Sequence, residues 1–397
     1  MSTPRIRLKE LSELITKGTT PTSLGFDFAD SGVGFLRVQN VSGGRVNYEQ
    51  NTLFINAQVH QELKRSQILS GDVLLSIAGT IGRTGVVPEN APPLNCNQAV
   101  AIIRPTQKVF RSFLRHWLES NDAQSQMRGS TVTGTIQNLS LAQVGNLQVP
   151  LPPLPEQIRI AAILDQADAL RVKRREALTQ LNSLTQAIFI EMFGDPISNP
   201  KKWNMVRLGD HTLKMGSGST PTGGDTAYKE SGISLIRSLN VHDGRFTYKN
   251  LAFIDDQQAS KLSNVKVEEG DVLLNITGAS VARVCRAPKN VLPARVNQHV
   301  MIIRPKPTID SMYLEQLLLS PIMKKNLLQI GAGATRESIT KAQAEELKVI
   351  CPPPVLQQKF AKRIELVAGI RLSHTASLKE LDNLFTSLQH RAFRGEL

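Results

Sequence analysis

Hydrophobic and polar residues follow two different periods along this chain, and the change of period marks its organisation. Short β-branched runs bounded by glycine, proline and asparagine, from Gly71 to Ile77 and from Ala99 to Ile103, are typical of strands joined by turns. The segments from Phe110 to Asn121 and from Ser311 to Leu319 predict helices. From Ile160 onward, apolar residues recur at alternating steps of three and four, which predicts a long helix with an apolar seam.

The first long helix is expected to run from about Pro155 to Phe193. Proline fits the first turn of a helix but not its interior, and Gly194-Asp195-Pro196 ends the pattern. The same heptad positions recur 200 residues later, from Phe360 to Ala392. A seam kept over so many heptads favours packing against a partner helix, so the two helices are predicted to pair. The alternative is two unrelated amphipathic helices, each packed on its own domain.

The chain repeats itself at an offset of 200 residues along nearly its full length, which indicates a tandem duplication. FLRVQNVSGGRVNY from Phe35 parallels LIRSLNVHDGRFTY from Leu235, and GDVLLSIAGTIGR from Gly71 parallels GDVLLNITGASVAR from Gly270. The predicted fold class is α+β, a strand-rich domain occurring twice, each copy followed by a long helix. The expected segments are a first domain at 1–150, a hinge and helix at 151–195, a second domain at 196–350, and a hinge and helix at 351–397.

The net charge of +13 favours a polyanionic partner, because a basic surface gains free energy by releasing counterions from nucleic acid. No stretch reaches the roughly 18 apolar residues that cross a bilayer, and the start lacks a secretion signal. Three scattered cysteines favour neither a disulfide framework nor a zinc site. A soluble, cytoplasmic, double-stranded DNA-binding protein is therefore expected.

Two glycine-rich segments, Gly79 to Gly82 and Gly216 to Thr220, superficially resemble phosphate-binding loops. Neither has the Gly-Lys-Ser/Thr ending of a nucleotide loop or a complete G-x-G-x-x-G, so neither is predicted to bind ATP or a dinucleotide. A self-contained DNA methyltransferase is disfavoured because no Asn-Pro-Pro-aromatic motif occurs. A nuclease is disfavoured because the Glu-x-Lys triplets at Glu62 and Glu346 lack an acidic partner upstream in a credible strand. A coiled-coil scaffold that binds proteins is the remaining alternative.

Three motifs give the chain a specific family resemblance. They are PPLPEQ at the start of the first helix, MFGDP...NP..W from Met192 to Trp203, and the GTIGR loop from Gly79 to Arg83. With them, essentially the whole chain resembles the specificity subunit of type I restriction-modification systems. The second half departs from the pattern, with VLQQ in place of LPEQ and, near Ser280 and Arg283, ASVAR in place of TIGR.

The resemblance implies two target recognition domains, one for each half of a bipartite DNA site, separated by an antiparallel coiled coil that sets their spacing. It implies no catalytic activity and no cofactor in this chain. It also implies two methyltransferase subunits that use S-adenosylmethionine and, through them, restriction subunits that use ATP and Mg.

Polar residues identical in both halves are expected to hold the fold or grip phosphates, because they cannot by themselves read two different half-sequences. Structural arginines that brace turns are the equally weighted alternative for the arginines of this set. Asn97-Gln98 and Asn297-Gln298 are also shared and are expected to cap turns. The shared DNA-contact candidates from the segments at Phe35 and Leu235 are Arg37, Asn40, Arg45, Arg237, Asn240 and Arg245.

Segments that differ between the halves are where base reading is expected, since they are rich in glycine and small polar residues suited to loops near DNA. The four paired segments are Lys17 to Phe28 with Lys214 to Tyr228, Thr80 to Arg83 with Ala279 to Arg283, Leu94 to Cys96 with Ala294 to Val296, and Arg128 to Thr135 with Gly331 to Arg336. Their candidate DNA-binding residues are Lys17, Thr20, Thr80, Arg83, Asn95, Arg128, Thr131, Thr133, Lys214, Ser219, Thr220, Ser280, Arg283, Arg295 and Arg336.

Overall fold

The chain forms two compact units, each built around one copy of the repeat. The computed structural model describes residues 3–130, 138–221, 223, 227–331 and 338–397. Unit 1 comprises Met1–Arg175 and Ala376–Leu397, and unit 2 comprises Glu176–Thr375. Each unit combines a globular half with parts of both long helices. This grouping differs from the four consecutive segments expected from the sequence, and those boundaries stay a prediction.

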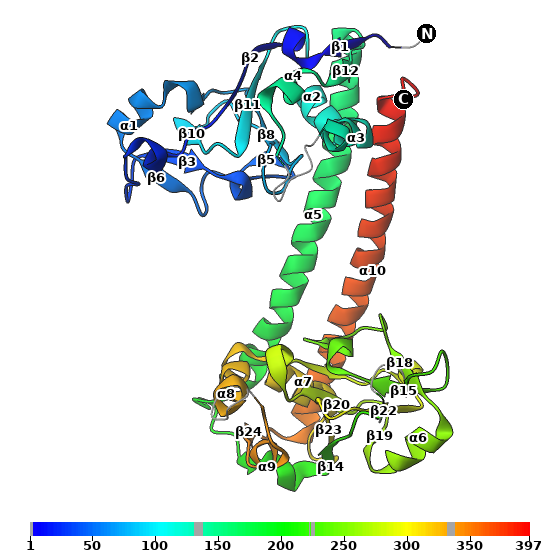
Figure 1. Cartoon of the computed structure of the whole chain (residues 1–397). Helices are drawn as coiled ribbons and strands as arrows, with labels where there is room; N and C mark the ends of the chain where they lie inside the picture. Colours follow the sequence, from blue (N-terminus) through cyan, green and yellow to red (C-terminus); the bar gives the residue numbers. More distant parts are fainter. Residues whose placement is uncertain (1–2, 131–137, 222, 224–226, 332–337) are drawn as a thin grey trace. The chain divides into compact units, whose positions relative to one another are not determined.

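Two sheets form the strand-rich half of unit 1 (Figure 1). The described strands run in the orders β2-β11-β8-β9-β5-β4 and β6-β3-β10-β7, mostly antiparallel, with parallel pairs at β5-β9 and β3-β10. β1 pairs with β12 and ties the start of the chain to the segment before the long helix. The strands are β1 Arg5–Arg7, β2 Ser12–Lys17, β3 Val33–Leu36, β4 Val41–Ser42, β5 Gly44–Val46, β6 Leu53–Ile55, β7 Gln67–Ile68, β8 Val73–Ser76, β9 Thr84–Val86, β10 Leu94–Cys96, β11 Val100–Pro105 and β12 Gln148–Pro150.

Helices cover the first of these sheets. The predicted helix at Phe110 to Asn121 is confirmed as α2, although it ends at Leu118 and α3 follows directly. Phe113 and Trp117 of α2 are buried in one core with Val73 and Ile103 of the sheet. The α-helices of this half of unit 1 are α1 Ala57–Glu62, α2 Arg111–Leu118, α3 Asn121–Ser130 and α4 Leu141–Gly145.

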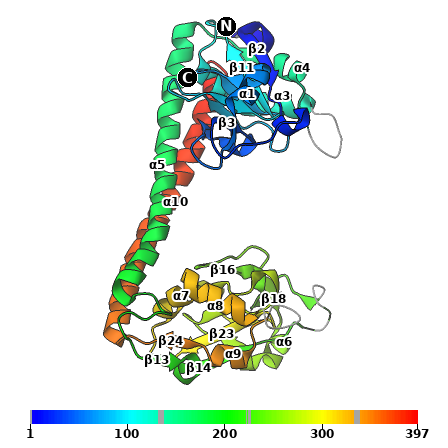
Figure 2. The ribbon, with the colours of Figure 1, turned by 90° about the vertical axis from the view of Figure 1, so that its left-hand side faces the viewer.

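Unit 2 repeats this arrangement, and Figure 2 shows α7 and α8 beside the sheet that contains β23. Its described sheets have the orders β14-β23-β20-β21 and β18-β15-β22-β19, with a separate β16-β17 pair and a β13-β24 pair. The strands are β13 Met205–Arg207, β14 Thr212–Ser217, β15 Ile233–Ile236, β16 Val241–His242, β17 Arg245–Phe246, β18 Ala252–Ile254, β19 Lys266–Val267, β20 Val272–Asn275, β21 Val284–Arg286, β22 Ala294–Val296, β23 Val300–Pro305 and β24 Lys348–Ile350. The helices are α6 Asp256–Lys261, α7 Ser311–Leu319, α8 Pro321–Gly331 and α9 Lys341–Glu345.

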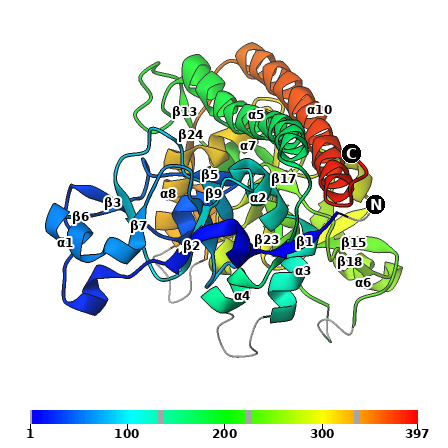
Figure 3. The same ribbon diagram turned by 90° about the horizontal axis from the view of Figure 1, so that it is seen from above.

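Two long helices complete the fold, α5 at Leu154–Phe193 and α10 at Pro354–Ala392. In unit 1 the start of α5 packs against the end of α10, which Figures 1 and 3 both draw side by side. The Arg171 guanidinium bonds Asp382 at 2.7 Å and lies 4.1 Å above the Phe385 ring. In this way an arginine that interrupts the apolar heptad pattern still contributes to the seam.

In unit 2 the opposite ends of the same helices meet. Phe189 and Phe193 from the end of α5 pack against Phe360 from the start of α10, with ring centroids 5.7 and 5.2 Å apart. In both units, therefore, the start of one helix lies against the end of the other. The predicted antiparallel helix pair is confirmed, and the alternative of two unrelated helices is excluded.

A buried glutamine in each repeat fastens the long helix to its domain. Gln157 accepts a hydrogen bond from the Phe110 amide at 2.8 Å and donates to the carbonyls of Lys108 and Pro152. Gln357 makes the same three bonds in unit 2. This explains why the glutamine survives in both PPLPEQ and VLQQ while the residues around it change, because a buried amide needs all its partners.

The tryptophan of the MFGDP...NP..W motif caps the C-terminal end of α5. The Trp203 indole donates to the carbonyl of Phe193 at 2.9 Å, which satisfies one of the last carbonyls of the helix. Gly194 follows with φ of +77°, a left-handed conformation that favours glycine. The spacing in MFGDP...NP..W is thus a helix-ending device.

Candidate DNA interface and helix junctions

Two of the loops chosen from the sequence, after β2 and after β8, meet the turn at Asn97 and Gln98 at one edge of unit 1. The amides of Gly18 and Thr19, after β2, donate to the carbonyls of Val100 and Cys96, both at 3.1 Å. The Thr20 hydroxyl bonds the amide oxygen of Gln98. The loop after β2 is therefore fixed against the turn between β10 and β11.

The loop that contains the GTIGR motif joins the same edge. Ile77, at the end of β8, donates to the Ala99 carbonyl at 2.8 Å and accepts from the Leu139 amide at 2.8 Å. Gln124 of α3 donates to the Gly82 carbonyl at 3.1 Å, which holds the tip of the loop. Loops that are distant in the sequence thus form one surface, which we call the loop edge of unit 1 and define as residues 17–20, 77–83 and 97–99.

Unit 2 has the same loop edge, formed by residues 217–220, 276–283 and 297–299. The Gly218 amide donates to the Asn297 carbonyl at 3.1 Å, and Ile276 donates to the His299 carbonyl at 3.0 Å. Glycine is required at the first contact, because a Cβ on Gly218 would lie 1.9 Å from the Val296 carbonyl oxygen. A Cβ on Gly18 would lie 2.0 Å from the carbonyl oxygen of Cys96. Both edges are therefore built on the same close backbone approach.

Many of the candidate DNA contacts have side chains open to solvent. Outside the described residues lie Thr131, Thr133 and Arg336. Exposed are Arg45, Thr80, Arg83, Arg128, Ser219 and Arg245, while Lys17, Thr20, Lys214, Thr220, Ser280 and Arg283 are half-buried. Of these twelve, all but Arg45, Arg128, Lys214 and Arg245 belong to the two loop edges. Their DNA contacts stay a prediction.

Three of the asparagine candidates are buried, and the structure gives them internal roles instead of DNA contacts. Asn40 is 2 % exposed, accepts from the Arg37 amide at 2.9 Å and donates to the Asn47 carbonyl at 3.0 Å. Asn240 is fully buried and makes the equivalent bonds. Asn95 is fully buried in β10, where its amide donates to the Leu63 carbonyl at 3.2 Å. The choice of all three as DNA contacts is corrected, because a side chain enclosed by its own domain cannot reach a base edge.

The paired arginines of the shared segments divide between the two roles that the sequence left open. Arg37 donates to the Asn51 carbonyl at 3.1 Å, and Arg237 donates to the Asn250 carbonyl at 2.7 Å. Both brace a turn, which favours the structural alternative. Arg45 and Arg245 are exposed, which leaves them available to phosphates.

Arg295 is half-buried and also satisfied internally. It donates to the carbonyls of Ala259 and Ala294 at 3.2 and 3.0 Å, and burial lowers the pKa of its guanidinium. Arg295 is the repeat equivalent of Asn95, so at this position both units use the side chain for hydrogen bonds within their own domain. The turn beside it matches the expectation, since the Asn97 and Asn297 side chains cap the amides of residues 99 and 299 at 3.2 and 3.0 Å.

Two buried ion pairs, one in each unit, were not predicted from the sequence. Asp72, 1 % exposed, receives two bonds from Arg104 at 2.8 and 2.9 Å, and Asp271 receives the same from Arg304 at 2.7 and 2.9 Å. The signal was available, because both members of the pair recur within the repeated GDVLL and IIRP segments. These bidentate pairs join β8 to β11 and β20 to β23 at the strand ends opposite the loop edges.

A polar network joins α2 to the helix pair in unit 1. Arg115, whose side chain is 7 % exposed, bonds Asp165 of α5 at 2.9 Å and Glu119 at 3.2 Å. His116 bonds the same Asp165 at 2.8 Å. Its carbonyl accepts from Gln389 of α10 at 3.0 Å, and burial lowers the pKa of its imidazole. We call these residues the polar junction.

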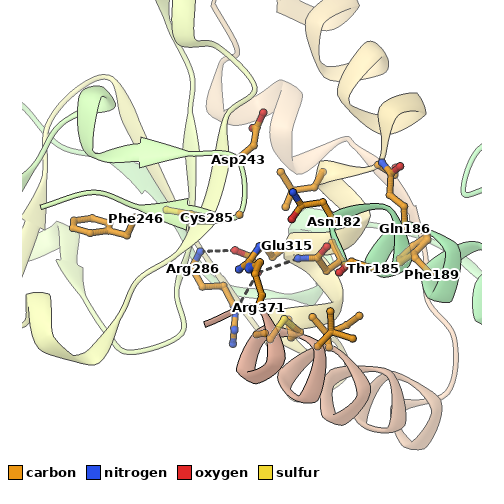
Figure 4. Close-up of a pocket in the computed structure, with 18 of the residues that line it drawn as sticks. Asn182, Thr185, Gln186, Phe189, Asp243, Phe246, Cys285, Arg286, Glu315 and Arg371 are labelled. Carbon is orange, nitrogen blue, oxygen red and sulfur yellow. Dashed lines mark hydrogen bonds and ion pairs between the residues drawn. The ribbon is translucent and has the colours of Figure 1, made fainter. Parts of the chain in front are cut away.

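Unit 2 has a hollow of about 740 Å³ at the equivalent place, where unit 1 leaves only about 280 Å³. Glu315 stands where Arg115 stands in unit 1, and it bonds the amide and the guanidinium of Arg286 at 2.9 and 3.2 Å (Figure 4). Burial raises the pKa of the Glu315 carboxyl. Phe189, Met312 and Arg371 also line the hollow. We call this region the open junction.

The described residues offer no cluster of three or more His, Cys, Asp or Glu side chains that could hold a metal ion. Within the same residues, none of the helices is long and apolar enough to cross a bilayer. What the structure provides in each unit is a strand-rich domain with a loop edge, packed against parts of α5 and α10.

Comparison with known proteins agrees with this arrangement. A family profile described as the type I restriction modification DNA specificity domain matches residues 5–182 and 200–383. The chain belongs to this family. As a specificity subunit it is a non-catalytic, DNA-recognising component, and methylation and cleavage belong to other subunits.

Relatives of this family member match along most of its length. The EcoKI specificity subunit of Escherichia coli K12 is 23% identical over 394 residues, covering 93% of this chain and 83% of the relative. The crystal structure of the type I S subunit from M. genitalium aligns with a TM-score of 0.60 at 14% identity, covering 98% of this chain and 95% of that one. A chain from a study of assembly and conformational transition of the type I R-M system aligns with a TM-score of 0.60 at 20% identity, covering 100% and 98%. The two structural matches support the fold.

Proposed function

We propose that this specificity subunit recognises a bipartite DNA site, with one half-site read by each loop edge. The observation that carries the proposal is that one backbone frame occurs twice with different side chains at the same edge. Gly18 and Gly218 fix the frame in both copies, whereas Ala99 in one copy is His299 in the other. Equal frames with unequal edges suit two different half-sequences approached in the same way.

The basic side chains of the two edges suit this role. Arg83 and Arg283 occupy matching places at the end of the GTIGR and ASVAR segments, Lys17 is the last residue of β2, and Lys214 lies within β14. Arginine and lysine supply both guanine contacts and phosphate contacts in DNA complexes. The overall charge of +13 adds a sequence-independent attraction to the duplex.

The antiparallel helix pair is proposed to set the gap between the half-sites and to dock two methyltransferase subunits. Several large apolar residues of α5 and α10 are exposed, and in each unit one of them from each helix occupies a repeat-equivalent position. They are Leu170 and Leu384 in unit 1, at 49% and 51% exposure, and Leu184 and Ile370 in unit 2, at 42% and 48%. The same exposed pair in both units suits two copies of one partner.

The cofactors of the system are proposed to belong to those partners. S-adenosylmethionine would be bound by the methyltransferase subunits, and ATP and Mg by restriction subunits that join through them. This chain is proposed to bind none of the three, since its glycine-rich loops lack the nucleotide-binding pattern.

A domain exchange tests the proposal. The chain is expressed with its methyltransferase partner in cells without other adenine methylation, and methylated sites are mapped by sequencing. Replacing residues 1–150 by the equivalent domain of another specificity subunit is expected to change one half-sequence only. Removing whole heptads from both helices is expected to change the gap only.

Two results would count against the proposal. One is methylation or cleavage of DNA by the purified chain alone with Mg and S-adenosylmethionine, which would make it an enzyme. The other is a footprint on a single continuous site in place of two patches about one helical turn apart. Co-purification without methyltransferase but with an unrelated protein would favour the scaffold alternative.

A further inference from the structure

Four polar side chains form a continuous hydrogen-bonded chain across the loop edge of unit 2. The Thr220 hydroxyl bonds Oε1 of Gln298. Nε2 of Gln298 lies 3.1 Å from Nε2 of His299, and Nδ1 of His299 lies 2.6 Å from Oγ1 of Thr277. The chain connects the loop after β14, the turn before β23 and the loop after β20, so it crosses the whole edge.

The direction of the chain follows from its end at Thr220. Oε1 of Gln298 accepts from that hydroxyl, so the amide nitrogen of Gln298 donates to Nε2 of His299. The imidazole is then neutral, carries its hydrogen on Nδ1 and donates to Oγ1 of Thr277. Two donors of these four side chains are not used in the hydrogen bonds between them: the hydroxyl hydrogen of Thr277 and the second amide hydrogen of Gln298.

Unit 1 has only the first link of this chain. Thr20 bonds Gln98 as Thr220 bonds Gln298, but alanines stand at the positions of His299 and Thr277, namely Ala99 and Ala78. The backbone around them is the same, because both loops make the same strand-end bonds to residues 99 and 299. The difference between the edges is therefore one of side chains.

We infer that His299 is a specificity-determining residue, which fixes the donors of Gln298 and Thr277 so that unit 2 reads its half-site more strictly than unit 1 reads its own. The inference rests on the proposed function. A fixed amide and a fixed hydroxyl match acceptors on the major-groove edges of bases, such as N7 and O6 of guanine or O4 of thymine. The amide of Gln98 lacks this second support and must lose rotamer freedom on binding.

The test uses the full chain with its methyltransferase partner and maps methylation at correct sites and at sites with one wrong base. His299→Ala is expected to reduce discrimination at one or two positions of a single half-site by about tenfold, the scale of one good base contact. The other half-site is expected to stay unchanged. Co-purification with the partner and continued methylation of correct sites show that the variant is folded.

Two further variants separate hydrogen bonding from bulk. His299→Asn keeps a donor near the place of Nδ1, so its discrimination is expected to lie between wild type and His299→Ala. A His299→Asn variant no better than His299→Ala would overturn the inference, because side-chain volume would then explain the effect. The double variant Ala78→Thr/Ala99→His installs the missing links in unit 1 and is expected to sharpen the other half-site.

The outcomes distinguish this inference from the proposed function. If the wild-type complex methylates no bipartite sequence, the proposed function fails. If it does, and His299→Ala leaves every position of both half-sites unchanged or relaxes both equally, the inference about His299 fails while the proposed function stands.

Discussion

The two helix junctions show how one backbone frame can be held together by opposite chemistry. At the polar junction of unit 1, Arg115 reaches Asp165 of α5 at 2.9 Å. At the open junction of unit 2, Glu315 occupies the matching position and turns to Arg286 on β21. Unit 1 adds ion pairs to the apolar contacts between its helices and its domain, whereas unit 2 has the packed rings of Phe189 and Phe193.

A glycine shows how closely each solution is fitted. A Cβ on Gly44 would lie 2.5 Å from the Arg115 guanidinium, whereas the nearest atom to a Cβ on Gly244 is a Leu319 methyl at 3.5 Å. A side chain at position 44 would therefore require the Arg115 guanidinium to move from its place in the polar junction. The comparison teaches that the frame depends on shared features such as Gln157 and Gln357, while the junction chemistry is free to change.

The largest effect is expected at the aromatic cluster of unit 2. Phe193 is fully buried, with ring centroids 4.9 Å from Tyr313 and 5.2 Å from Phe360. Phe193→Ala should destabilise unit 2 by about 4 kcal/mol, because a cavity remains where the ring was. Hydrogen exchange of amides in each unit, measured across urea concentrations, reports the loss and its location.

Phe393→Ala is the matched control, at the equivalent position 200 residues later. Its ring is only partly buried, 5.4 Å from Phe113, so about 2 kcal/mol is expected in unit 1. Equal losses from the two variants would show that the aromatic cluster has no special weight in unit 2.

A smaller effect is expected from the polar junction. Arg115→Met removes the cation that Asp165 and Glu119 share, and the partly exposed carboxylates can take up water in its place. A loss of about 2 kcal/mol in unit 1 follows from breaking a largely buried charged network. Slower exchange or no change in α2 and the start of α5 would contradict the role given to this arginine.

The fold was largely predictable because its signals are long and repeated. The long helix expected from Pro155 to Phe193 begins one residue earlier, and Ser311 to Leu319 is α7 as predicted. The aromatic cluster was not predictable in the same way. Phe189 and Phe193 lie outside the heptad positions and pack against Tyr313, a contact between residues more than a hundred positions apart.

The candidate site was predictable as loops but not as residues. The divergent loops after β2 and β8 do lie at one edge, yet Asn95, chosen from another divergent segment, is buried in a central strand. His299 was passed over because its neighbours Asn297 and Gln298 are shared by both repeats. The role inferred for His299 depends on its hydrogen bond with Thr277, and the sequence alone does not show that these two residues are in contact.

The smallest expected effect is a difference in how the two junctions respond to acid. Burial lowers the pKa of His116 below its ordinary value of about 6.5, despite its bond to Asp165 and with Arg115 adding to the shift. As the pH falls, the imidazole is therefore protonated in the unfolded chain at a higher pH than in the folded chain. The contribution of His116 to the free energy of unfolding is fully present above pH 6.5 and decreases as the pH falls below 6.5. Relative to His116→Gln, wild-type unit 1 should lose stability between pH 7 and pH 5.5, by at most about 1.4 kcal/mol per pH unit.

Glu315 should give the opposite sign in unit 2. Burial raises the pKa of its carboxyl, and the ion pair with Arg286 only partly offsets this. The folded chain then holds the proton more tightly than the unfolded chain, so the contribution of this group is largest below its unfolded pKa and is lost as the pH rises through the folded one. Relative to Glu315→Gln, wild-type unit 2 should gain stability as the pH falls toward the unfolded pKa of about 4.5. Urea unfolding of both variants at several pH values, followed by exchange in each unit, measures the two slopes. Slopes of the same sign would mean that the charge reversal between Arg115 and Glu315 has no separate electrostatic consequence, and the contrast between the junctions would then reduce to packing.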